Sequence, residues 1–241
     1  MTSGPHWDSE GTVISEMSGK IGFAIYPNTA PRLSSDVIAR FAALPTGNIA
    51  DSMLRFRAMD AEIKPIWSGM RLAGQAVTVM TRPGDNLMVH KALEVASPGD
   101  IIVVDTTGGY RSAVFGELMA SVARGAKLGG IVVDGCVRDA AELEEIGFPT
   151  FAKTVAATAC DKDGPGEINT AVSCGGVAVL PGDVIVGDDD GVVVIPIGLA
   201  MEVLEASEAK AKQEERRLAD IAAGQLFTPD INKTLKDKGV I

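Results

Sequence analysis

An arginine and an aspartate, Arg138 and Asp139, stand side by side shortly after the apolar run 130–133. An arginine can hold a carboxylate or a keto oxygen through a two-pronged, charge-assisted hydrogen bond, and a carboxylate oxygen suits a hard cation such as Mg²⁺. Together the two groups could stabilise the enolate of a 2-oxo acid. The alternative is a structural pair that anchors a turn, because surface ion pairs are common and weak.

A third charged residue, Glu117, lies one expected helix and one expected strand earlier, behind the glycine-containing segment 106–110. It opens a helix expected over 115–126, where free backbone N–H groups suit a small anion. The simpler interpretation is a loop that only caps the helix. In a parallel strand–helix–strand unit, the helix start and the end of the next strand share one edge of the sheet. We therefore expect Glu117, Arg138 and Asp139 to meet where α/β proteins place ligands.

The elements that must position these residues alternate along the chain. Apolar periodicity predicts helices and strands in turn, which indicates an α/β layered sheet. Beyond residue 153, short valine-rich strands and then a long charged helix are expected, and the length of this helix suggests packing onto another subunit. The expected helices are 32–43, 46–56, 86–95, 115–126, 140–146 and 198–223, and the expected strands are 75–80, 101–104, 130–133, 150–152, 184–187 and 192–195, with further short strands within 171–180.

Other polar clusters have simpler interpretations. The acidic run 188–190 is flanked by glycines between valine-rich strands, which is typical of a hairpin turn rather than a metal site. Asp85 or Asn86 is expected to cap a helix, and His90 to be a packed or surface residue. Asp134 is interpreted as a turn residue at the end of its strand.

Charge and composition exclude several classes of function. The net charge of −10 disfavours nonspecific binding to nucleic acid or an anionic membrane, and the apolar content of 46% supports a substantial core. No run is long enough to span a bilayer, and the first twelve residues lack signal-peptide features and are interpreted as a flexible arm, so we expect a cytoplasmic protein. Three cysteines without CxxC spacing are expected to be reduced, and with only two histidines any metal should be held by oxygen.

The segments 116–118, 129–139 and 181–196, together with the sequence PTGNIADSML, resemble the RraA-like family. That family includes the 4-hydroxy-4-methyl-2-oxoglutarate / 4-carboxy-4-hydroxy-2-oxoadipate aldolases and the regulators of ribonuclease E activity. The resemblance spans roughly residues 33–225. It implies an α/β fold of the swivelling β/β/α type, with N-terminal helices and a long C-terminal helix. It also implies one domain over 31–241 after an N-terminal arm over 1–30, assembled as a homotrimer or homohexamer with active sites between subunits.

The resemblance also implies roles for individual residues. Arg138 would bind and polarise a pyruvyl group, Asp139 would bind Mg²⁺ or Mn²⁺, and Glu117 would place the water that protonates the enolate. The family's motif usually has an aspartate where this chain has Glu117, which is one methylene longer. A glutamate of a neighbouring subunit, Glu214 or Glu215, would approach the site. The pyruvate carboxylate would be received by backbone amides of Gly116, Glu117, Leu118 and Met119.

The implied activity is pyruvate-releasing, metal-dependent aldol cleavage with oxaloacetate decarboxylation as a side reaction. The alternative within the family is a noncatalytic regulator that binds ribonuclease E or another protein. Such regulators lack the aspartate after the arginine and the long C-terminal helix, whereas this chain has Asp139 and an expected helix over 198–223. A phosphohistidine swivelling domain would need a histidine after its glycine-rich loop, and none lies between residues 91 and 241.

Overall fold

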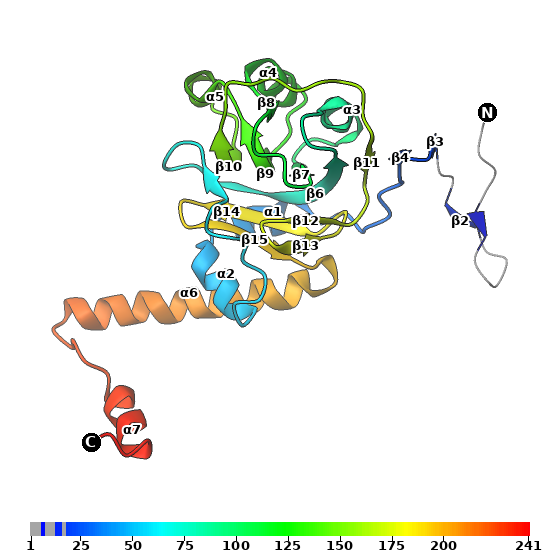
Figure 1. The fold of residues 1–241 in the computed structure, drawn as a ribbon. Coiled ribbons are helices and arrows are strands. Elements are labelled where there is room, and N and C mark those ends of the chain that lie inside the picture. Colours follow the sequence, from blue (N-terminus) through cyan, green and yellow to red (C-terminus); the bar gives the residue numbers. More distant parts are fainter. Residues whose placement is uncertain (1–5, 8–12, 16–17) are drawn as a thin grey trace.

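The computed structural model describes residues 6–7, 13–15 and 18–241 (Figure 1). Its centre is a mixed sheet with the strand order β3-β4-β11-β6-β7-β9-β10-β5. The strands β6, β7, β9 and β10 run parallel and form the middle of this sheet. Their bounds are β6 Leu72–Thr81, β7 Ile101–Asp105, β9 Gly130–Val137 and β10 Thr150–Val155, and the flanking strands are β3 Ser18–Lys20, β4 Phe23–Ile25, β5 Lys64–Pro65 and β11 Gly166–Ile168.

One face of the sheet is covered by helices α3, α4 and α5, which lie together above it in Figure 1. Apolar side chains of these helices join those of β6, β7 and β9 in one buried cluster. Burial on both faces explains why the parallel strands read as continuous apolar runs rather than alternating ones. The helices are α3 Leu87–Val95, α4 Glu117–Gly125 and α5 Ala140–Ile146, and a short strand, β8 Ala113–Phe115, leads into α4.

The other face carries a second β layer and then helices. The hairpin β12 Val172–Cys174 and β13 Val177–Val179 and the hairpin β14 Val184–Asp188 and β15 Gly191–Ile195 pack here, with β14 also antiparallel to β6. Helices α1 Ser35–Ala42 and α2 Thr46–Ser52 and the start of α6 Ala200–Ala222 cover β14 and β15, after a short 3₁₀ turn over Ile197–Leu199. These layers and the 23-residue helix α6 confirm the expected α/β fold with a long C-terminal helix.

The acidic run 188–190 is confirmed as a hairpin turn, with Asp188 opposite Gly191 in the ladder. The carboxylates of Asp188 and Asp189 accept hydrogen bonds from other segments and do not converge on a common point. Asp188 accepts hydrogen bonds from the amide and hydroxyl of Thr46 at 2.9 and 2.6 Å, and Asp189 accepts one from the amide of Gly69 at 2.8 Å. The turn therefore pins α2 and a neighbouring loop to the second β layer.

Several boundaries differ from expectation. The helix expected over 115–126 begins at Glu117, because β8 pairs with β9 and holds residue 115 in a strand. Near the N-terminus, β4 pairs with β11 and so joins the main sheet, while the limit of the predicted arm at residue 30 stays a prediction. The flexible segment expected over the first twelve residues lies mostly outside the described residues. A last helix, α7 Pro229–Asp237, is not among the elements expected from the sequence.

Helix α6 is only half packed. Its first half buries Val203 and Leu204 and is tied to the domain by Arg40–Glu208 at 2.7 Å and Lys210–Asp51 at 2.9 Å. Its second half extends away from the domain and ends near α7 (Figure 1). None of the described helices is long and apolar enough to cross a membrane.

The interpretation of Asp134 as a strand-end turn residue is wrong. β9 continues to Val137, and Asp134 lies within it, 2.7 Å from the ammonium of Lys153 on β10. Lys153 also donates to the hydroxyl of Tyr110 at 3.0 Å, and Asp134 accepts from the amide of Gly175 at 2.7 Å. This cluster joins two strands, the loop before β8 and the β12–β13 hairpin.

Replacing Lys153 by methionine should destabilise the fold by about 2–4 kcal/mol, because Asp134 is left largely buried without its cation. Burial lowers the pKa of Lys153, but hydrogen bonds to Asp134 and Tyr110 outweigh it and raise the pKa above its usual value. The stabilisation is therefore complete below about pH 10 and is lost only as pH rises through the raised pKa. Urea unfolding at pH 7 and pH 9 should give the same loss.

The control is Lys91→Met, which breaks an exposed pair with Glu94. It should cost less than about 1 kcal/mol. Equal losses in the two variants would show that the Lys153 cluster does not stabilise the fold.

Candidate functional site

The edge of the sheet where β9 ends brings Arg138 and Asp139 to the start of α4. The amide of Arg138 donates to the carbonyl of Phe115 at 3.0 Å, which fixes the end of β9 beside β8. Asp139 adopts a left-handed backbone conformation, with φ of 57°, as the residue before α5. Its Oδ2 accepts a hydrogen bond from the amide of Glu117 at 3.0 Å and lies 3.3 Å from Nε of Arg138. The predicted meeting of the helix start and the strand end is confirmed.

Gly116 is required here by close approach. Its φ of −166° is extended backbone that any residue can adopt. However, a Cβ at this position would lie 2.5 Å from Oδ2 of Asp139 and 2.9 Å from Cγ of Arg138. The absence of a side chain therefore lets the ion pair lie against the backbone that begins α4.

The start of α4 offers backbone donors beside the ion pair. The amide of Ala120 makes the first α-helical hydrogen bond, to the carbonyl of Gly116, so the amides before it have no partner within the helix. The amide of Glu117 is taken by Asp139. The amides of Leu118 and Met119 remain available to an anion, whose charge the helix dipole also favours.

A cavity of about 110 Å³ lies against this corner. No acidic side chain lines it in the part of the chain described. Its walls include Asn86, His90, Gly116, Met119, Arg138 and Lys162.

The structure separates the remaining predicted residues from this corner. The side chain of Glu117 is exposed and forms neither a hydrogen bond nor an ion pair with any described residue, so only its backbone meets Asp139. Glu214 lies on the projecting half of α6, 3.5 Å from Lys210, and Glu215 follows it. α6 and α4 lie on opposite sides of the sheet (Figure 1), so neither glutamate can complete the site of its own chain.

Comparison with known proteins identifies the family to which the chain belongs. A family model described as "RraA-like: Aldolase/RraA" matches residues 46–194. The chain belongs to the RraA-like family. A provisionally named 4-hydroxy-4-methyl-2-oxoglutarate aldolase of Halalkalibacterium halodurans is 40% identical over 182 residues, which cover 76% of this chain and 87% of that protein. The 4-hydroxy-4-methyl-2-oxoglutarate aldolase of Thermus thermophilus is 32% identical over 63% of this chain and 92% of its own.

Solved structures of other proteins share the fold. Streptomyces coelicolor RraAS2, described as an unusual member of the RNase ES inhibitor RraA protein family, superposes with a TM-score of 0.71 at 26% identity, over 78% of this chain and 98% of its own. An uncharacterised protein of Pseudomonas syringae superposes with a TM-score of 0.75 at 25% identity, over 82% of this chain and 93% of its own. The relatives therefore include proteins named as enzymes and a protein described within an inhibitor family.

The sequence did not indicate that two polar residues, Asn86 and Lys162, belong to this site. Asp85 fulfils the expected capping role by accepting from the amide of Leu87 at 2.9 Å. Asn86 instead turns its side chain toward the cavity wall, where Nδ2 donates to the carbonyl of Val114 at 3.2 Å. Lys162 reaches the same cavity from a loop beyond β10 and belongs to no motif that sequence could signal.

His90 is exposed, as expected, and it also lines the cavity. Partial burial lowers its pKa, and the charge of Lys162 lowers it further. The imidazole is therefore mainly neutral at pH 7, which suits hydrogen bonding more than charge pairing.

The RraA-like corner suits a hard divalent cation. Both contacts of Asp139 use Oδ2, so Oδ1 can face a cation, whereas the exposed side chain of Glu117 makes no contact that fixes it at the corner. Mg²⁺ typically binds one or two carboxylates and completes its shell with water and substrate. The described residues contain no cluster of three or more histidine, cysteine or acidic residues, so the chain itself would supply only a minority of the ligands.

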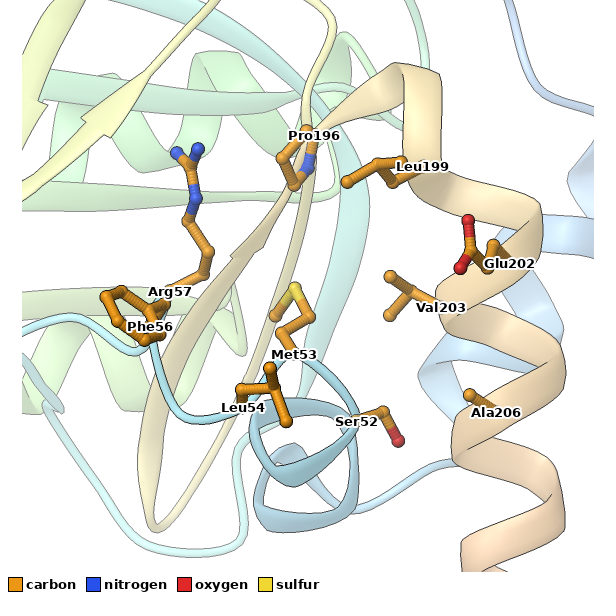
Figure 2. A pocket seen from close by; sticks show the side chains of 10 residues that line it. All are labelled: Ser52, Met53, Leu54, Phe56, Arg57, Pro196, Leu199, Glu202, Val203 and Ala206. Atoms are coloured by element: carbon orange, nitrogen blue, oxygen red, sulfur yellow. The ribbon is translucent and has the colours of Figure 1, made fainter.

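A second hollow lies between α2 and the start of α6 (Figure 2). Its volume is about 310 Å³, and its walls are mainly apolar, with Met53, Leu54, Phe56 and Leu199 among them. Its two charged residues, Arg57 and Glu202, lie on opposite sides (Figure 2). This hollow lacks the convergent polar groups of the Arg138 corner.

Substituting Gly116 by alanine should expel the Arg138–Asp139 pair from its place and destabilise the protein by about 1–3 kcal/mol, because the new Cβ overlaps both side chains. Urea unfolding would measure the loss. Gly125→Ala in the same helix is the matched control, since a Cβ there meets nothing within 4 Å. It should leave stability unchanged or raise it by up to about 1 kcal/mol. If both variants were neutral, the close approach at Gly116 would not be a constraint.

Proposed function

We propose that this RraA-like protein is a divalent-metal-dependent, pyruvate-releasing aldolase. Its substrates would be 4-hydroxy-2-oxo acids such as 4-hydroxy-4-methyl-2-oxoglutarate or 4-carboxy-4-hydroxy-2-oxoadipate, with oxaloacetate decarboxylation as a side activity. The observation that carries the proposal is the contact of Arg138 and Asp139 with the amide end of α4. The guanidinium of Arg138, the carboxylate of Asp139 and the free amides of α4 meet there within one corner.

The corner can bind the pyruvyl half of such a substrate. The amides of Leu118 and Met119 receive the C1 carboxylate, since the positive end of α4 favours an anion. The guanidinium of Arg138 pairs with Asp139 alone among the described carboxylates, with Nε as the nearest nitrogen, so its terminal nitrogens can donate to the C2 keto oxygen. The ion pair with Asp139 through Nε keeps the guanidinium oriented.

Cleavage breaks the C3–C4 bond. Its electron pair moves into the pyruvyl half and forms an enolate, while the C4 hydroxyl gives its proton to a water molecule and becomes the carbonyl of the departing keto acid. A water oriented by Glu117 would then deliver a proton to C3, which yields pyruvate. Arg138 lowers the barrier because it meets charge that develops on the keto oxygen.

Mg²⁺ or Mn²⁺ held by Asp139, with help from Glu117, would add positive charge beside the same oxygen. Oxaloacetate would lose CO₂ from C4 through the same enolate. One binding arrangement therefore accounts for both reactions.

The alternative function is noncatalytic binding of ribonuclease E or another protein. The likeness to the Streptomyces coelicolor protein supports it. Asp139 and the long helix α6, which the resemblance associates with the aldolases, favour the enzyme.

We also propose that the protein works in the cytoplasm as a homotrimer or homohexamer, without nucleic-acid or membrane partners. Leu118 and Val122 lie one turn apart on α4 and are 76% and 58% exposed, which suits burial against another subunit next to the site. The projecting half of α6 exposes Leu218 and Ile221 in the same way.

Pyruvate release from oxaloacetate should occur with Mg²⁺ and be abolished by EDTA, because the metal and Arg138 share the enolate charge. Arg138→Ala should lower turnover by about 10² to 10³-fold, with an unchanged melting curve and oligomeric state. The measurement is pyruvate formation over time at matched enzyme concentrations.

Lys91→Met is a suitable control for a lost positive charge, because Lys91 pairs only with the exposed Glu94 among described residues. Release that ignores EDTA, or an Arg138→Ala enzyme with near-normal rates, would contradict the proposed chemistry. Complete inactivity of the wild type would favour the binding protein.

The variants Glu214→Ala and Glu215→Ala should differ in activity. They are adjacent on α6 and point to different sides of a helix, so one of them at most can face a neighbouring subunit's site. We expect one variant to lose about 10-fold or more of its turnover, the order expected for a supporting ligand or proton-transfer group, and the other to be silent. If both variants kept wild-type turnover, neither glutamate would contribute to a neighbouring subunit's site.

A further inference from the structure

The cavity beside Arg138 has an unusual charge balance. The protein carries a net charge of −10, yet the described residues that line this cavity include Arg138, Lys162 and His90 and no acid. The enolate chemistry uses only one of these groups. A second cationic group in so small a cavity indicates a ligand with a second negative charge.

The ammonium of Lys162 is free to pair with that second negative charge. It is exposed at the cavity wall, and no described carboxylate lies within 4.0 Å of its ammonium. It is close enough to His90 to lower the pKa of the imidazole. Neutral His90 adds a hydrogen-bonding group beside the ammonium without adding a charge.

Asn86 gives an independent sign of a ligand in this cavity. It is only 8% exposed, and its Oδ1 has no hydrogen-bond partner among the described residues. The orientation of the amide is fixed, because the carbonyl of Val114 and the sulfur of Met119, at 3.2 and 3.7 Å from Nδ2, can only accept. A buried acceptor without a donor is rare in folded proteins and calls for one.

We propose that this cavity is the subsite for the departing half of the substrate, with Lys162 binding its carboxylate and Asn86 accepting a hydrogen bond from the C4 hydroxyl. This rests on the proposed aldolase function and deepens it. The pyruvyl half occupies the α4 amides and Arg138, and the departing half extends past Met119 toward Lys162 and His90. The chain then selects 4-hydroxy-2-oxo acids that carry a second carboxylate on or near C4.

Two reactions separate this subsite from the enolate site. Cleavage of 4-hydroxy-4-methyl-2-oxoglutarate needs both halves, whereas exchange of the pyruvate methyl protons with D₂O, followed by NMR, needs only the pyruvyl half. With Mg²⁺ present, Lys162→Met should lower kcat/KM for cleavage by about 10- to 100-fold, mainly through KM. Exchange should change by less than about 3-fold, since Arg138 and the α4 amides are untouched. Lys162→Arg should retain most of the cleavage.

Lys91→Met is the matched control, because it removes a charge next to His90 on α3 without lining the cavity. It should leave both reactions near wild type. Equal loss of cleavage and exchange in Lys162→Met, or no loss in either, would overturn the carboxylate subsite. A wild-type protein that performs neither reaction would instead refute the aldolase function, so the two failures are distinguishable.

Asn86→Leu tests the hydroxyl contact with a side chain of similar size. It should lower cleavage by about 10-fold more than exchange, because only the cleaved substrate carries the C4 hydroxyl. Asn169→Gly controls for loss of a buried asparagine, since Asn169 is also 8% exposed, donates to a backbone carbonyl and has an unpartnered Oδ1, but lies away from this cavity. Parallel losses in both reactions of Asn86→Leu would limit Asn86 to holding β8 and would overturn its contact with substrate.

Discussion

The site depends on one close approach, between the backbone that begins α4 and the Arg138–Asp139 pair that follows β9. The hydrogen bond from the amide of Glu117 to Oδ2 of Asp139, at 3.0 Å, holds the two segments together. It is possible only because Gly116 has no side chain. The same contact orients the guanidinium and leaves the next two amides of α4 open. The corner that could bind an anionic keto acid therefore also holds the guanidinium that would polarise its keto group.

The layers of the fold support this contact from both sides. The α3–α4–α5 layer buries the parallel strands and sets where α4 begins, while the second β layer covers the opposite face. The buried Lys153–Asp134 pair joins β9 and β10 to the loop before β8. Each end of the β8–α4–β9 unit is thus anchored by contacts that are distant in sequence.

The two parts of the small cavity beside Arg138 have different proposed roles. In the proposed reaction, Arg138 and the α4 amides would face the part of a keto acid that becomes pyruvate, and Lys162 and His90, which line the same cavity, would face the other part. RraA-like relatives include proteins named as aldolases and a member of an inhibitor family. A common fold can therefore carry either chemistry or binding, and the residues around this corner are the place where such functions would diverge.

The sequence by itself determined the alternation of helices and strands and the place of the candidate site. Apolar runs such as 101–104 and 130–133 are local signals, and a parallel strand–helix–strand unit has only one edge where Gly116, Glu117, Arg138 and Asp139 can meet. It misjudged Asp134, because the strand continues past an acidic residue whose charge is matched by Lys153 from the next strand. Local patterns do not reveal a partner of that kind.

Only the tertiary structure decided which side chains complete the cavity. Asn86 and Lys162 are far apart in sequence and meet because a segment beyond β10 runs parallel to the start of α3, with Asp161 beside Asp85. The crowding that requires Gly116 is likewise visible only when β9 is in place. Such contacts depend on how loops return across a finished sheet, and neither periodicity nor residue type encodes that path.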